Sequence, residues 1–147
     1  MNEPVVISVE WTQRFIGEEK QTICIVTDGI MSRQGDTVYL SYEESEISGM
    51  EGTTTTFEVK KDSVSLYRTG TVESKMVFEK GNKDVSLYNA GFGAMTIGVQ
   101  ARRLRNELGP EGGRLEISYG IEIGEQIKGL NSFVIQVRRP GAEGLPQ

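Results

Sequence analysis

The chain of 147 residues contains no histidine. This absence excludes Ser-His and Cys-His nucleophile pairs and histidine-ligated metal sites. It also removes the side chain that most often transfers protons near neutral pH. We therefore expect a protein without catalytic activity, metal or cofactor, although an enzyme that uses tyrosine, lysine or carboxylate side chains stays open.

Cysteine and long apolar runs are scarce as well. The single cysteine, Cys24, cannot form an intramolecular disulfide, and its position in TICIV predicts a buried, inert thiol. No apolar run approaches the roughly 20 residues that a membrane helix needs. The N-terminal residues lack the basic and apolar segments of a signal peptide. We therefore expect a cytoplasmic protein that does not bind a membrane.

Basic residues are outnumbered, because 16 Lys and Arg face 21 Asp and Glu and leave a net charge of −5. A diffuse positive field is absent, so we expect no nucleic-acid partner. Two local charge clusters are predicted to be solvated. They are the arginines of ARRLRNEL, namely Arg102, Arg103 and Arg105, and the acidic group Glu43, Glu44 and Glu46.

What the chain does contain is alternation of apolar and polar residues with period two, which is typical of half-buried strands. The apolar members of the clearest runs are Val5, Ile7, Val9, Trp11 and Phe15; Val38, Leu40 and Tyr42; Leu115, Ile117, Tyr119, Ile121 and Ile123; and Phe133, Ile135 and Val137. The runs lie at hairpin spacing, which predicts an all-β antiparallel barrel or sandwich of about eight to ten strands. We expect one domain over residues 1–139 and a frayed tail over residues 140–147.

Two segments have competing interpretations. In NAGFGAMTIG the glycines could form a phosphate-binding loop or a bend. A phosphate loop needs a helix after it, and the alternating AMTIGVQA predicts a strand, so we favour a bend. In ARRLRNELGPEGG, Leu104 and Leu108 fit a helix. We favour a strand that ends near Leu104 and continues as a short turn or helix-like loop.

The order of VYLSYEES, VSLYRTGTVESKMVFEKG and SLYNAGFGAMTIGVQARRLRNELGPEGGRLEISYGIEIG resembles the YwiB-like family of uncharacterised bacterial proteins. Shared features are the strand Tyr39-Leu40-Ser41-Tyr42, the Arg68-x-Gly70 turn, the Phe92-Gly93 pair and the Gly113-Arg114 pair. The resemblance extends from about Ile7 to Val137. It implies a calycin (lipocalin-like) β-barrel without an assigned activity.

Side chains that the alternation directs into the barrel form the predicted ligand site. They are Trp11, Tyr42, Phe57, Arg68, Met76, Phe78 and Tyr119. A barrel of about eight strands holds either packed side chains or one small ligand, so this set could fill a core or line a pocket for a small apolar or amphipathic ligand. Arg68 shares the apolar face, where a guanidinium needs a carboxylate or carbonyl partner, a route to the rim, or an anionic ligand group.

The competing function is protein interaction or a structural role through an outer face or a strand edge, as a monomer or homodimer. Candidate contacts, if they face outward, are Phe15, Tyr39, Tyr67 and Tyr88. A ligand carrier requires a cavity, whereas an interaction module requires a filled barrel and an exposed apolar patch.

Overall fold

Ten antiparallel strands form a closed barrel, which confirms the predicted all-β barrel. The computed structural model describes residues 2–89, 93–124 and 127–141. The strands are β1 (Asn2–Phe15), β2 (Gln21–Gln34), β3 (Thr37–Glu43), β4 (Thr53–Val59), β5 (Ser63–Gly70), β6 (Glu73–Glu79), β7 (Lys83–Asn89), β8 (Ala94–Gly109), β9 (Gly112–Ile123) and β10 (Ile127–Arg138). No helix in these ranges is long and apolar enough to cross a membrane.

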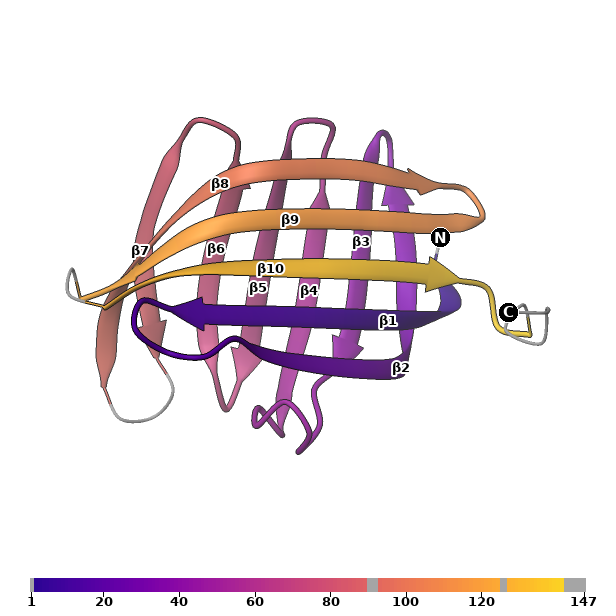
Figure 1. Ribbon diagram of the computed structural model, residues 1–147. Coiled ribbons are helices and arrows are strands. Elements are labelled where there is room, and N and C mark those ends of the chain that lie inside the picture. The colour runs from indigo at the N-terminus through magenta and orange to yellow at the C-terminus, as the bar shows by residue number, and fades with distance from the viewer. Residues whose placement is uncertain (1, 90–92, 125–126, 142–147) are drawn as a thin grey trace.

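The topology follows the chain order. Each strand pairs with the next one in the sequence, and β1 closes the barrel by pairing with β10 as well as β2. In Figure 1 the long strands β8, β9, β10 and β1 lie across the shorter strands β3 to β7. The wall of the barrel therefore consists of two crossed layers, with the core between them.

Alternation along the strands separates the inside of the barrel from the outside. The apolar runs of β1, β3, β9 and β10 that the sequence singled out are buried or pack against the core. Polar residues occupy most of the intervening positions, as expected for strands with one solvated face. The strand register is consequently fixed by burial, because a slip of one residue would turn the apolar set toward water.

The barrel closes least tightly between β6 and β7. These strands share two residue pairs, Glu73 with Asn89 and Ser74 with Tyr88. Side chains of β7 bond the backbone of β6 further along: the Val77 N–H donates to Asp84 Oδ2 at 3.1 Å, and Ser86 Oγ donates to a β6 carbonyl at 2.6 Å. Polar side chains thus satisfy backbone groups that a continuous ladder would otherwise pair.

Strand β8 corrects the interpretation of ARRLRNEL. It continues to Gly109, so the predicted strand end near Leu104 and the helix-like loop are wrong. A β-bulge between Ala101 and Arg103 inserts Arg102 and resets the alternation. Leu104 and Leu108, whose spacing also fits a helix, then point inward and pack against the core.

The structure also corrects the environment of Cys24. This residue is exposed, so the prediction of a buried thiol is wrong. Ile23 and Ile25 face the interior, and the pleat therefore turns Cys24 outward, where its Sγ lies 3.9 Å from Glu10 Oε2.

The glycine-rich segment leads into a strand, as predicted. Strand β8 begins at Ala94, directly after Gly93, which has a φ of 111°. A helix for phosphate binding does not follow the glycines. Residues 90–92, and residues 142–147 of the predicted tail, lie outside the described part of the chain.

Candidate functional site

Two layers of apolar side chains fill the interior against strands β3 to β6. Paired positions across these strands form one layer of Val38, Val59, Val64 and Phe78, and a second layer of Leu40, Phe57, Leu66 and Met76. Each of these side chains is at most 5% exposed. Three predicted site residues, Phe57, Met76 and Phe78, therefore belong to a packed core.

The third layer is polar. The register aligns Tyr42, Thr55, Arg68, Ser74 and Tyr88 in one row across five strands. All five have the strand parity of the apolar layers, so they face the interior. The polar row lies at one end of the barrel, next to the turn segment 44–52 that connects β3 to β4.

Arg68 is the central charge of this row. Its side chain is 8% exposed, yet its Nε–H has no hydrogen-bond partner. No ion pair joins it to a carboxylate among the described residues. Of its three guanidinium nitrogens, Nε alone is both fully buried and without a partner. Leaving one buried N–H unpaired costs about 1–3 kcal/mol, so this donor is a candidate contact for a ligand.

Glu44 lies in the same region, which corrects the prediction that its acidic cluster is solvated. Glu43 and Glu46 are exposed, but Glu44 is 7% exposed. Thr55 Oγ1 donates a hydrogen bond of 2.5 Å to Glu44 Oε2, whereas Oε1 has no partner. Glu44 comes directly after β3 and, like Leu40 and Tyr42, points toward the interior. Its hydrogen-bond partner Thr55 lies on the adjacent strand β4.

Trp11 and Tyr119 contribute from the opposite wall. The Phe133 ring stacks against both, with centroid distances of 6.3 Å to Trp11 and 6.0 Å to Tyr119. Asn131 Nδ2 donates to the Tyr119 hydroxyl at 3.4 Å, while Asn131 Oδ1 is buried without a partner. The Trp11 Nε1–H is likewise buried; it lies near the Tyr119 hydroxyl but outside hydrogen-bonding geometry.

Burial governs the titration of the two interior tyrosines nearest Arg68. It raises the pKa of Tyr42, and the neighbouring Glu44 carboxylate raises it further. Burial also raises the pKa of Tyr119, an effect that the nearby Asn131 and Trp11 donors partly offset. Both phenols therefore stay neutral at physiological pH.

A small hollow connects these groups. It has a volume of about 20 Å³, and its lining includes Trp11, Tyr42, Glu44, Arg68 and Met50. This volume holds about one water molecule. Two unpaired donors, from Trp11 and Arg68, and one unpaired acceptor, from Glu44, border it. The hollow can therefore bind a small polar group that accepts from the arginine side and donates to the carboxylate.

The predicted site residues thus divide into two groups. Trp11, Tyr42 and Arg68 line the hollow, and Tyr119 lies beside it, whereas the three core residues do not reach it. Sequence reasoning missed Glu44, Thr55 and Asn131. Thr55 carried a signal, because TTTTFEV places it on the same face as Phe57.

The four aromatic residues considered for an interaction surface also separate. Phe15 and Tyr88 pack against the core rather than standing free on the surface. The hydroxyls of Tyr39 and Tyr67 both donate to Glu58, over 3.0 Å and 3.2 Å, on the outer face. The bond to Glu58 raises the pKa of Tyr39.

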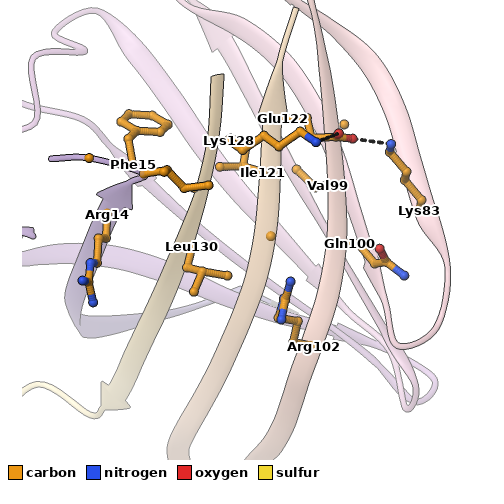
Figure 2. A pocket seen from close by; sticks show the side chains of 15 residues that line it. Arg14, Phe15, Lys83, Val99, Gln100, Arg102, Ile121, Glu122, Lys128 and Leu130 are labelled. Atoms are coloured by element: carbon orange, nitrogen blue, oxygen red, sulfur yellow. Dashed lines mark ion pairs between the residues drawn. The ribbon is translucent and has the colours of Figure 1, made fainter. Parts of the chain in front are cut away.

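A larger hollow lies on the outer face of β1, β10, β9 and β8 (Figure 2). Its volume is about 630 Å³, and its charged lining residues are Arg14, Lys83, Arg102, Lys128 and Glu122. Figure 2 shows Arg14 and Arg102 on either side of Leu130, and Lys83 and Lys128 both paired with Glu122. Among the described residues, no group of three or more Cys, Asp or Glu side chains is placed to hold a metal ion.

Comparison with known proteins agrees with this architecture. The chain is similar to the "Uncharacterized beta-barrel protein YwiB" of Bacillus subtilis (strain 168), with 27% identity over 110 residues that cover 74% of this chain and 75% of that protein. Its fold matches the crystal structure of the ywiB protein from Bacillus subtilis with a TM-score of 0.78 at 21% identity, over 92% of each chain. The sequence profile of the domain of unknown function DUF1934 matches residues 7–135. The resemblance predicted from the sequence is confirmed, and the chain belongs to the DUF1934 family of β-barrel proteins of unknown function.

Proposed function

We propose that this protein is a non-enzymatic binding protein that holds a small ligand by an anionic group at the polar end of its barrel. The observation that carries the proposal is Arg68, a residue that is 8% exposed, whose buried Nε–H has no hydrogen-bond partner and which forms no ion pair among the described residues. A carboxylate or phosphate oxygen would supply the missing partner, because the planar guanidinium binds such groups with charge-assisted hydrogen bonds.

The groups around Arg68 support a ligand that carries both an acceptor and a donor. Trp11 Nε1 offers a second unpaired donor, and Glu44 Oε1 an unpaired acceptor. A protonated or hydroxylated anion would satisfy all three. Buried polar atoms are otherwise paired in more than nine of ten cases, so several orphans around one hollow favour a binding site.

The hollow is too small to enclose a whole apolar or amphipathic ligand, the kind of ligand considered from the sequence. Phe57 and Phe78 are fully buried in the apolar layers and do not line the hollow, whose volume of about 20 Å³ accepts only a head group. Ser48 and Met50 of the turn segment 44–52 also line it. We infer that an anionic head group enters beside these two residues while the rest of the ligand lies outside the barrel.

Tryptophan fluorescence tests the proposal directly, because Trp11 is the sole tryptophan and lines the hollow. The wild-type protein is titrated with acetate, butyrate, hexanoate and phosphate. We expect a saturable change in Trp11 emission for at least one of these anions. Arg68→Gln should abolish the change, and Arg33→Gln, which alters an exposed arginine of β2, should retain it.

An equal response of Arg68→Gln and the wild-type protein would overturn the proposal, as would the absence of any response. The calycin class, the cytoplasmic location, the expected absence of catalysis and the alternative of protein interaction through an outer face remain predictions.

A further inference from the structure

We propose that the outer hollow over β8, β9, β10 and β1 is a second binding site, which takes a small phosphorylated molecule. This site lies outside the barrel and does not depend on the function proposed for Arg68. Its charge and the conformation of Arg102 carry the inference.

One row of paired positions crosses the hollow. Arg14 on β1 pairs with Leu130 on β10, Leu130 with Gly120 on β9, Gly120 with Gln100 on β8, and Gln100 with Lys83 on β7. With about 4.8 Å between neighbouring strands, the row spans roughly 19 Å. The hollow is therefore broad enough for a molecule with several phosphate groups.

Arg102 enters the hollow because of two local features of the chain. The bulge of β8 inserts this residue and frees its side chain from the regular alternation. Gly120 then leaves room for it: Arg102 Nε lies 3.5 Å from the point that a Cβ at Gly120 would occupy. The guanidinium can thus lie over the bare backbone of β9.

The basic side chains of the hollow are only partly neutralised. Glu122 pairs with Lys83 and, at 3.8 Å, with Lys128. Arg14 and Arg102 have neither a hydrogen bond nor an ion pair within the described chain. Four cations thus face one carboxylate on a protein whose net charge is −5. Such a local reversal of sign attracts anions.

A second hollow extends the site along the same face. It has a volume of about 290 Å³ and shares Arg14, Leu130 and Arg102 with the first. It adds Lys20 and the hydroxyls of Thr12, Ser118 and Ser132. The two unpaired arginines therefore lie at the junction, with hydroxyl donors on one side and the lysine pair on the other.

A small phosphorylated molecule fits these features better than a nucleic-acid strand. Proteins that bind single strands use exposed aromatic rings on which bases stack. Phe15 is the only aromatic side chain around the larger hollow within the described residues, and it packs against the core. Arginine forks and hydroxyls instead match the oxygens of phosphate groups.

Calorimetric titration with inorganic tripolyphosphate tests the site. We expect saturable binding to the wild-type protein that weakens with added salt. Arg14→Gln/Arg102→Gln should weaken binding by at least about tenfold, because each arginine supplies charge-assisted hydrogen bonds. Arg33→Gln and Arg68→Gln should bind as the wild-type protein does, and thermal unfolding verifies that every variant is folded.

Three results would overturn the inference. The first is undetectable binding of tripolyphosphate to the wild-type protein. The second is equal weakening by Arg33→Gln, which would indicate attraction to any surface arginine. The third is tighter binding of a single-stranded oligonucleotide than of tripolyphosphate in the same groove, which would identify a nucleic-acid site instead.

Discussion

Arg68 and Glu44 border the same small hollow, each more than nine-tenths buried, without forming an ion pair. Thr55 donates a hydrogen bond to Glu44 Oε2, and the other carboxylate oxygen, Oε1, is buried without a partner. Two opposite charges that are both buried but do not meet form an arrangement that costs stability. A ligand group that reaches both would recover that cost on binding.

The burial of both charges beside one hollow gives the first prediction, which concerns stability. Arg68→Met should lower the free energy of unfolding by about 1–3 kcal/mol, because Glu44 then stays buried without an opposite charge nearby. Glu44→Gln/Arg68→Met should return it to within about 1 kcal/mol of the wild-type value or above it. Urea unfolding measures both, with Arg33→Met, which alters an exposed arginine near the end of β2, as the control. Losses that simply add in the double variant would contradict this coupling.

The interior tyrosines predict the response to alkali. Burial raises the pKa of Tyr42 and Tyr119 in the folded protein above the value near 10 of the unfolded chain. Their contribution to stability is therefore complete below about pH 10 and is lost as the pH rises toward the folded-state values, by up to about 1.4 kcal/mol per pH unit for each tyrosine. Tyr42→Phe should flatten this fall in urea unfolding. An unchanged slope would show that Tyr42 does not titrate as its burial implies.

Glu122 predicts a response to acid at the outer hollow. Its hydrogen bond and ion pair with Lys83 lower its pKa below the ordinary value of 4.5, and Lys128 adds a smaller effect. The pair therefore stabilises the fold above the unfolded-state pKa, and this contribution is lost as the pH falls through the folded-state pKa. In an NMR titration of the Glu122 carboxyl, Lys83→Met should raise the midpoint more than Lys128→Met does. The reverse order would mean that Lys128 is the principal partner.

Alanine substitutions at two glycines distinguish the stability cost of backbone strain from the added cost of a steric collision. Gly17 and Gly70 both have positive φ, 86° and 121°. A Cβ at Gly17 meets nothing within 4 Å, whereas a Cβ at Gly70 would collide with the carbonyl oxygen of Gly52. Gly17→Ala should cost about 1 kcal/mol and Gly70→Ala about 3 kcal/mol or more, as thermal or urea unfolding would measure. Equal costs would show that the chain around Gly52 yields easily.

The residues that face the barrel interior could be predicted from the sequence, because apolar and polar residues alternate along each strand. Arg68 follows Val64 and Leu66, and it lies inside as that pattern requires. Glu44 could have been predicted too, since it continues the parity of Val38, Leu40 and Tyr42. Its neighbours Glu43 and Glu46 suggested a solvated cluster, and the partner Thr55 on the next strand could not be foreseen without the register.

The outer hollow could not be predicted from the sequence. Arg14 and Lys83 are far apart in the chain and share a face only because β1 closes onto β10 and strand pairing continues from β10 through β9 and β8 to β7. The orientation of Arg102 depends on a bulge that strand pairing creates. Such sites arise from topology, whereas the pattern within one strand reports only inside and outside.

The most direct test of the central claim is native mass spectrometry of the protein purified from its own host, together with Arg68→Gln. We predict an added mass on the wild-type protein that leaves on denaturation and is missing from Arg68→Gln. Its composition should include an anionic group. A wild-type protein that carries no added mass, or an added mass that Arg68→Gln retains, would contradict the assignment of the polar end of the barrel as a ligand site.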